Sequence, residues 1–326
     1  MMTHILTLAL RRLITTIPAL IIILITLFLL LQLAPGDTVD ALLAQIGGAE
    51  SSVIDEMRHY YELDQSTSSR LLNYLWRLVH LDLGQSAIYN KPVSHMILER
   101  LPATLLLMIS AMSLAFTCGT ILGILSAQKV NRWPDTLISI LGLIFYSTPS
   151  FWLALMGIVF FSIYLNWLPP SGFGSIEQSL TGFSAILDIA WYLILPTITL
   201  ALVYLAIYLR IMRASLLEVS TLDFVKTAKA KGLSSRKILV NHVLRNAMLP
   251  MITLIGLQAG TMLGGSVVIE TIFAIPGLGR LAYDSVVQRD LNTLLGVVFI
   301  SAILVIFINF IVDMLYAKLD PRITGH

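Results

Sequence analysis

Six apolar stretches, each long enough to cross a lipid bilayer, constrain this 326-residue chain more than any other feature. The hydrocarbon core of a bilayer is about 30 Å thick, and an α-helix crosses it with about 20 predominantly apolar residues. Runs of this length indicate helices, which satisfy their backbone polar groups internally. We therefore predict an all-α membrane protein with six transmembrane helices, near 13–34, 103–127, 136–165, 189–208, 247–269 and 293–316.

The composition agrees with this class and argues against an enzyme. Hydrophobic residues make up 57% of the chain and charged residues only 12%, whereas soluble chains average about 25% charged residues. The single cysteine, Cys118, excludes a disulfide framework, and the six histidines are scattered without metal-ligand spacing, so we expect no metal site. No Gly-Lys dipeptide occurs, which excludes a Walker A phosphate loop. We expect no catalytic residues and no nucleic-acid partner.

The positions of lysine and arginine predict the orientation, because short cytoplasmic loops carry an excess of both. Four basic groups fall on one side of the six predicted spans: Arg11 with Arg12, Lys129 with Arg132, the loop 210–245, and Lys318 with Arg322. Both termini are therefore predicted to be cytoplasmic (N-in/C-in). The first span has no small-residue cleavage site after it and is expected to be an uncleaved anchor.

The segment from Asp223 to Pro250 is a polar, basic stretch between two apolar spans. Residues 224–231 are predicted to form a short helix that stops at Gly232, and Ser234 or Ser235 caps a second helix running toward Pro250. Its basic residues are Lys226, Lys229, Lys231, Arg236, Lys237 and Arg245. A basic loop that only obeys the positive-inside rule is one interpretation. A helix–Gly–helix unit that another protein grips is the other.

The pattern of Gly232, His242, Asn246 and Pro250 resembles the coupling ("EAA") loop of ABC-importer permeases, in its dipeptide/oligopeptide/nickel branch. Lys226 stands where the name-giving glutamate would be, which is usual for that branch. Two more stretches resemble the same family: Pro35-Gly36-Asp37 in the first loop, and the E-x-x-F-x-x-P-G-L-G-R run from Glu270 to Arg280. The resemblance covers nearly the full length.

The resemblance implies a type I ABC importer permease: a non-enzymatic, multi-pass subunit of the bacterial inner (cytoplasmic) membrane that forms half of a translocation pathway. Its implied partners are a homologous second permease, two cytoplasmic ATPases, an extracytoplasmic solute-binding protein and membrane lipid. ATP and magnesium would be bound by the ATPases, and this chain would bind no cofactor. Di- and oligopeptides are the expected cargo, with nickel or a metal–chelator complex as the alternative. Alternatives of another class are an ion-coupled secondary transporter and a non-transporting membrane anchor.

The implied domains are the N-terminus with the first transmembrane helix (1–34), an extracytoplasmic helical loop (35–101) and a five-helix permease core (102–326) that includes a cytoplasmic coupling loop (214–246). Within 35–101 we predict helices at 53–63 and 71–81. Their apolar face would lie in the headgroup layer or cap the bundle, or would form part of a platform for the binding protein.

Three sets of site residues follow from the resemblance and the patterns. The ATPase-coupling residues are Asp223, Phe224, Val225, Lys226, Thr227, Ala228, Lys229, Ala230, Lys231 and Gly232, supported structurally by His242, Asn246 and Pro250. Small residues let membrane helices approach closely, so Gly256, Gly260 and Gly264, at four-residue spacing, are candidates for pore lining or helix packing. An outer-gate turn is assigned to Glu270, Pro276, Gly277, Gly279 and Arg280.

Overall fold

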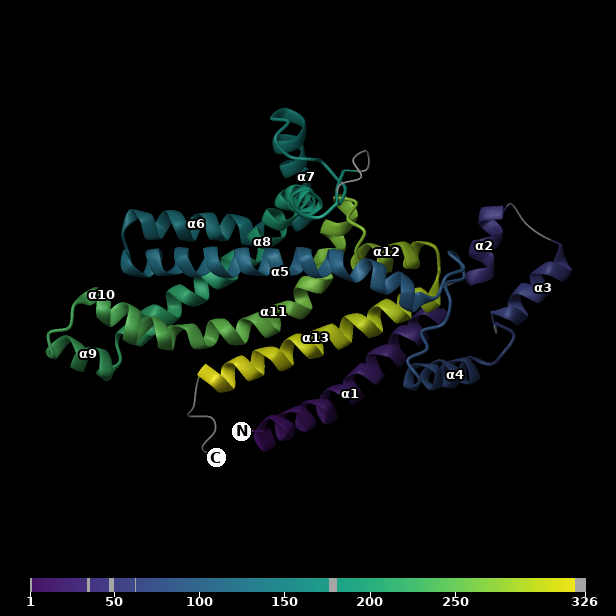
Figure 1. Ribbon diagram of the computed structural model, residues 1–326, viewed down its shortest axis with the longest axis horizontal. Coiled ribbons are helices and arrows are strands. Elements are labelled where there is room, and N and C mark those ends of the chain that lie inside the picture. The colour runs from purple at the N-terminus through teal and green to yellow at the C-terminus, as the bar shows by residue number, and fades with distance from the viewer. Residues whose placement is uncertain (1, 34–35, 47–49, 62, 176–180, 320–326) are drawn as a thin grey trace. The chain divides into compact units, whose positions relative to one another are not determined.

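The computed structural model describes residues 2–33, 36–46, 50–61, 63–175 and 181–319, and the regular elements in these ranges are helices (Figure 1). Two compact units make up the chain. The first contains residues 1–103 and 276–306, and the second contains residues 104–275 and 307–326. Two long helices, α5 (Val93–Gln128) and α13 (Leu291–Leu319), contribute residues to both units.

Four helices in the described ranges are long and apolar enough to cross a membrane, and five if one bent pair counts as a single span. The four are α5, α8 (Phe183–Ser220), the continuous helix Ser235–Ile272, and Leu291–Met314 of α13. Ile17–Leu33 of α1 (Met2–Leu33), where the first span was predicted, is a shorter apolar helix. The all-α membrane class is confirmed, while the number of six and the orientation stay predictions.

The third predicted span, 136–165, is broken into two helices. α6 (Trp133–Ser147) ends before Pro149, and α7 (Ser150–Gly157) continues as the π-helical segment η1 (Ile158–Tyr164) at an angle of 102°. A residue that precedes a proline is pushed out of the helical region, and Thr148 is extended, with φ −85° and ψ 128°. Pro149 therefore explains the position of the break.

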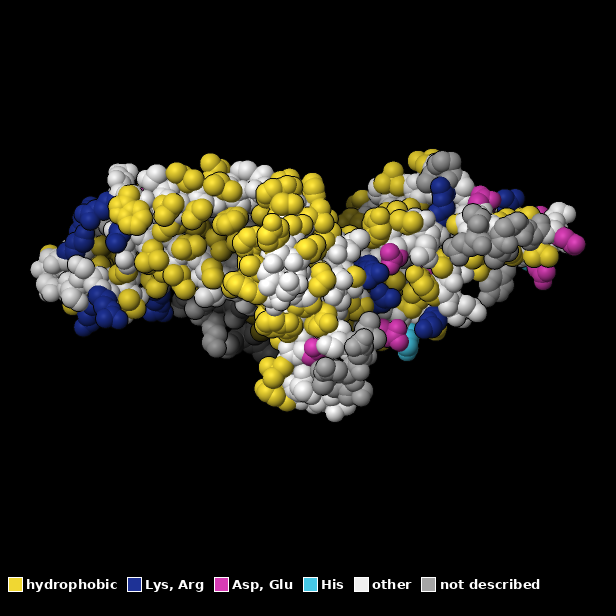
Figure 2. All heavy atoms as spheres, turned by 90° about the horizontal axis from the view of Figure 1, so that it is seen from above, with side chains coloured by type: hydrophobic (Ala, Val, Ile, Leu, Met, Phe, Trp, Pro, Cys, Tyr) yellow, Lys and Arg dark blue, Asp and Glu magenta, His cyan; other side chains and the backbone are white. Residues whose placement is uncertain are grey.

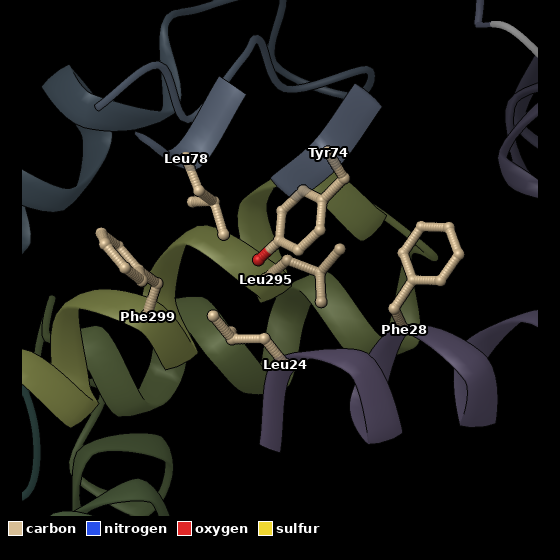
Figure 3. Packing of buried hydrophobic residues seen from close by; sticks show 6 residues of the cluster. All are labelled: Leu24, Phe28, Tyr74, Leu78, Leu295 and Phe299. Carbon is tan, nitrogen blue, oxygen red and sulfur yellow. The ribbon is translucent and has the colours of Figure 1, made fainter. Parts of the chain in front are cut away.

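The first unit contains α1, α2 (Thr38–Ile46), α3 (Ser51–Tyr60), α4 (Thr67–Val79), α12 (Leu278–Val287) and the first parts of α5 and α13. α3 and α4 lie at the two helices predicted for the first loop, whereas α2 and α12 had no predicted counterpart. One apolar cluster joins α1, α4 and α13 through Leu24, Phe28, Tyr74, Leu78, Leu295 and Phe299 (Figure 3).

Tyr74 is the polar side chain among the six residues of this cluster. Its hydroxyl is buried without a hydrogen-bond partner. Figure 3 shows the oxygen pointing between Leu78, Leu295 and Leu24. Burial raises the pKa of the Tyr74 hydroxyl, so it stays protonated at physiological pH. Burying this hydroxyl without a hydrogen bond destabilises the folded state, and a phenylalanine at the same position would avoid that cost.

Replacing Tyr74 with phenylalanine is therefore expected to raise the free energy of unfolding by about 1 kcal/mol. The thermal midpoint of the purified protein in detergent measures this effect. Leu78→Ala is the control, because truncating a buried leucine costs about 2–5 kcal/mol. A drop in midpoint with Tyr74→Phe would mean that the hydroxyl has a stabilising partner.

The second unit is built around α8, whose buried residues run along most of its length. α8 packs against α6, α7 and α11 (Arg245–Ile272). Two glycines of α5, Gly119 and Gly123, allow α5 to approach α8 closely. A Cβ atom at Gly123 would lie 2.7 Å from Cβ of Met212 and 2.8 Å from the backbone oxygen of Leu209. The G-x-x-x-G spacing in α5 is therefore a backbone contact between helices.

Gly123→Ala is expected to separate α5 from α8, because the new methyl group meets backbone atoms that cannot rotate away. Overpacking of this kind costs about 1–3 kcal/mol, which a lower thermal midpoint and a lower yield of folded protein would report. Gly264→Ala is the matched control, since no atom lies within 4 Å of a Cβ there. Equal behaviour of the two variants would contradict the close packing of α5 on α8.

Candidate coupling site

The predicted short helix in the polar loop is α9 (Asp223–Ala230), which follows α8 after a two-residue turn. Its first turn carries Asp223, a charge that suits the positive end of a helix dipole. The Asp223 carboxylate also accepts a bond of 2.8 Å from Lys226 Nζ. Val225 and Ala228 are buried, while the lysines of α9 are exposed. α9 therefore presents one packed face and one basic face.

Gly232 ends this helix in a specific way. Its φ is +75°, a left-handed conformation that glycine adopts without a steric penalty. The Gly232 N–H donates to the carbonyl of Lys229 at 2.9 Å, and the Leu233 N–H donates to the carbonyl of Ala228 at 3.3 Å. These two bonds define a Schellman motif, in which the residue after the C-cap must be left-handed. The predicted stop signal at Gly232 therefore fixes the direction in which the chain leaves α9.

The second helix of the loop starts at Ser235, after the N-cap residue Ser234. It continues without a break into the apolar stretch that follows. α10 (Ser235–Ile238), the π-helical segment η2 (Leu239–Leu244) and α11 form one helix, Ser235–Ile272, which contains the fifth predicted span. α10 contacts α9, and η2 contacts α8. A displacement of α9 would therefore be passed to α10 by direct contact, and from α10 to the apolar part of the same continuous helix.

His242, Asn246 and Pro250 recur at four-residue spacing and lie in the part of this helix with irregular hydrogen bonding. His242 belongs to η2, and the Asn246 side chain donates to the carbonyl of His242 at 2.6 Å. Pro250 lies inside α11 and has no N–H to give to the carbonyl one turn before it. The structure thus places all three in one short segment and gives Asn246 a specific bond.

Basic side chains gather around α9 and α10. Figure 2 shows dark-blue Lys and Arg groups concentrated at the end of the second unit where Figure 1 places these two helices. The basic residues of the loop are all exposed: Lys226, Lys229, Lys231, Arg236, Lys237 and Arg245. Only Lys226 has an acidic partner within the loop, Asp223. The surface is suited to an acidic protein groove.

An ion pair that sequence reasoning missed lies near this end of α8. Arg213 Nε and Nη2 each donate to a different oxygen of the Asp135 carboxylate, both at 2.8 Å. Ser126 of α5 also donates to Asp135, as does the Asn131 backbone N–H, at 3.0 Å. Asp135 is only 5% exposed. The network joins α5, α6 and α8, and an Asp in the first turn after Trp133-Pro134 was its only signal in the sequence.

The three glycines proposed for pore or helix packing have different surroundings. A Cβ at Gly256 would lie 2.6 Å from Oδ1 of Asn309 in α13, so Gly256 is at a close helix contact. Gly264 is exposed and meets nothing within 4 Å. Gly260 lies between them and is half-buried. One end of the row packs within the chain, and the other end faces away from the described residues.

The residues assigned to the outer-gate turn lie in α11, in α12 and in the connection between these two helices. The left-handed residue is Ala274, with φ +53°, and not a glycine. Gly277 is extended and precedes α12, while Gly279 and Arg280 belong to the first turns of that helix. Pro276 and Gly277 therefore lie in the short connection between α11 and α12, and the assignment of these residues to an outer gate stays a prediction. Glu270 is fully buried in α11 and accepts a bond of 2.8 Å from Thr104.

The Gly36-Asp37 part of the first-loop motif starts α2. Gly36 has φ +87°. The Asp40 backbone N–H donates to the Asp37 carboxylate, and the Asp37 backbone N–H donates to the Asp40 carboxylate, both at 2.8 Å. This reciprocal arrangement is a capping box. Arg289 fixes the turn by donating to the Gly36 carbonyl at 2.7 Å. Pro35, the other motif residue, lies outside the described residues.

Two cavities open in the first unit, with volumes of 420 and 530 Å³, and Arg70 lines both. Arg77 and Tyr61 line the first, and Arg289 lines the second.

In the described ranges, no three His, Cys, Asp or Glu side chains are grouped so that they could hold a metal ion.

Known proteins define the class of this chain. Residues 119–325, more than half of the chain, match the family described as "Binding-protein-dependent transport system inner membrane component". A "Putative peptide transport system permease protein" of Brucella abortus (strain 2308) is 39% identical over 316 residues, which cover 97% of this chain and 98% of the relative. The glutathione transport system permease protein GsiC of Escherichia coli O6:H1 is 37% identical over 313 residues, covering 96% and 97%.

A solved structure shows the same fold at low sequence identity. The MetNI methionine ABC transporter in an inward-facing conformation aligns with a TM-score of 0.57 and 18% identity, covering 70% of this chain and 97% of that chain. The chain therefore belongs to the binding-protein-dependent inner-membrane permeases and is an ABC importer permease of the dipeptide/oligopeptide family. It is a multi-pass protein of the inner membrane and a transport subunit, which excludes the secondary-transporter and anchor alternatives. Membership implies ATPase and binding-protein partners.

Proposed function

We propose that this chain forms half of the translocation pathway of an ATP-driven importer for small peptides, with α9 as the helix that receives force from a cytoplasmic ATPase. The observation that supports this most directly is the join at Gly232, where α9 turns directly into the continuous helix Ser235–Ile272. If the ATPase binds the basic face of α9, a displacement of α9 would move the helix Ser235–Ile272 together with it. The partner surface would be an acidic groove on the ATPase.

ATP binding would draw the coupling helices of two permeases together, and the helices of the second unit would switch between inward- and outward-facing packings. The close contacts of α5 on α8, and of Gly256 on α13, favour motion of nearly rigid helices. The surface of α11 at the exposed Gly264, next to the half-buried Gly260, would then be available to the second permease. The first unit would receive the solute-binding protein on the extracytoplasmic side.

Peptides are the proposed cargo because the relatives that match over nearly the whole length are named for peptide and glutathione transport. Glutathione is itself a tripeptide, so both names share one chemistry: a short backbone with free carboxylates. Nickel or a metal–chelator complex is the less favoured cargo. Selection would reside mainly in the binding protein.

The test is uptake into proteoliposomes that contain the complete transporter with its binding protein. We expect ATP-dependent accumulation of labelled di- or tripeptides, glutathione among them, and none with a non-hydrolysable ATP analogue. Uptake of nickel, free or chelated, in preference to peptide would overturn the proposed cargo. Uptake of peptide without ATP hydrolysis would overturn the proposed mechanism.

A further inference from the structure

A groove between α6 and α8 in the second unit has no role in the coupling described above. Its volume is 320 Å³, and its walls are mostly apolar, with Gly142 and Leu143 on α6 and Ala206 and Leu209 on α8. Leu143 is 64% exposed, so the groove opens to the outside of the unit. α6 and α8 belong to membrane-spanning segments, so the groove opens to lipid or to another membrane protein.

Two arginines line this groove, and their charges are balanced differently. Arg213 has its counterion, because the Asp135 carboxylate accepts two bonds from it. Arg210 is exposed and lies over the ring of Tyr146, with 5.8 Å between its guanidinium carbon and the ring centroid. Among the residues that the structure describes, no carboxylate forms an ion pair with Arg210. A net positive charge therefore remains inside an apolar groove.

The level of Arg210 in the membrane indicates the source of the missing counterion. The apolar run of α8, residues 189–208, ends two residues before Arg210. Arginine and tyrosine are typical of the boundary between hydrocarbon and headgroups, where long basic side chains reach phosphates. A cation over an aromatic face is stabilised only weakly, so the Tyr146 ring does not replace a counterion. Basic pockets between transmembrane helices bind the headgroups of anionic lipids.

We propose that the α6–α8 groove binds one anionic phospholipid, with the headgroup phosphate on Arg210 and part of an acyl chain against Gly142 and Leu143. The Tyr146 ring holds the Arg210 guanidinium in position, and the Asp135–Arg213 pair keeps the second arginine from competing for the phosphate. The lipid would stabilise the packing of α6 on α8, close to where α8 leads into the coupling helix.

Native mass spectrometry of the complete transporter, titrated with phosphatidylglycerol or phosphatidylcholine, tests the proposal. Arg210→Gln is expected to weaken phosphatidylglycerol binding about five-fold, which corresponds to about 1 kcal/mol per basic residue at the membrane surface. Phosphatidylcholine binding should be unchanged. Arg132→Gln is the matched control, because Arg132 is an exposed arginine at the start of α6 that does not line the groove. Ser139→Trp, which fills the groove and keeps Arg210, should weaken phosphatidylglycerol binding as well.

Equal losses in Arg210→Gln and Arg132→Gln would show a diffuse surface charge effect and overturn the proposal. Unchanged binding in Ser139→Trp would place the lipid elsewhere and overturn it too. Loss of the second permease from the Arg210→Gln complex, with phosphatidylglycerol binding intact, would identify a protein helix as the occupant of the groove and would also contradict the proposal.

Discussion

Gly232→Pro is expected to abolish ATP-driven uptake while the protein still inserts in the membrane. Proline fixes φ near −65° and has no N–H, whereas Gly232 has φ +75° and donates its N–H to Lys229. Both conditions for the Schellman turn are lost, so α9 can no longer transmit a displacement to the helix Ser235–Ile272. ATPase activity in the assembled complex should continue without transport. Paired measurements of hydrolysis and uptake in proteoliposomes report this uncoupling.

A graded series at the same position separates conformation from bulk. No atom lies within 4 Å of a Cβ at Gly232, so a side chain there meets no obstacle. Asparagine tolerates the left-handed region and should keep most of the transport, whereas valine, which is β-branched, should lose most of it. If valine and asparagine behave alike, the left-handed turn is not what transmits the motion.

Asp135→Ala is expected to destabilise the protein by about 3 kcal/mol. Removing one partner of a buried ion pair typically costs about 3–5 kcal/mol because the other charge is left unpaired, and the lower end applies because the Arg213 side chain is 29% exposed. Ser126 would lose its acceptor as well. The thermal midpoint of the protein in detergent measures the loss, with Asp223→Ala as the control for an exposed pair, where less than about 1 kcal/mol is expected.

The double variant Asp135→Ala with Arg213→Met tests whether the two side chains stabilise the protein as a pair. Because the unpaired arginine causes most of the cost, removing it should recover stability relative to Asp135→Ala alone. If the two single losses simply add, then Arg213 does not depend on Asp135.

The coupling loop could be predicted from local patterns because its signals are local. Gly232 after a run of lysines and alanines marks a helix end, and α9 ends as predicted at its left-handed turn. The first-loop helices α3 and α4 were found for the same reason: apolar residues recur at helical spacing within one short segment. The presence of a short helix and its approximate bounds are determined largely by residues that are close together in the sequence.

The bend at Pro149, the continuity of α10 with α11 and the Asp135–Arg213 pair could not be predicted in the same way. A proline marks a break but does not set its angle, here 102°. A helix starting after Ser234 or Ser235 was predicted to run toward Pro250, but its unbroken continuation to Ile272 was not. α8 and α9 pack against the first part of this helix, and such contacts between distant segments leave no local pattern in the sequence. Asp135 and Arg213 are 78 residues apart, and no periodicity relates them.

Cross-linking at α9 tests whether this helix contacts the ATPase. Thr227→Cys in a Cys118→Ser background places the only thiol on an exposed residue of α9, and Asn90→Cys in the same background places it in the first unit as a control. We expect the Thr227→Cys variant to cross-link to the nucleotide-binding subunit of the assembled transporter, with a yield that changes on ATP binding. We expect no such cross-link from the Asn90→Cys variant. Absence of that cross-link, or labelling of the α9 thiol by a membrane-impermeant reagent from outside intact cells, would contradict it.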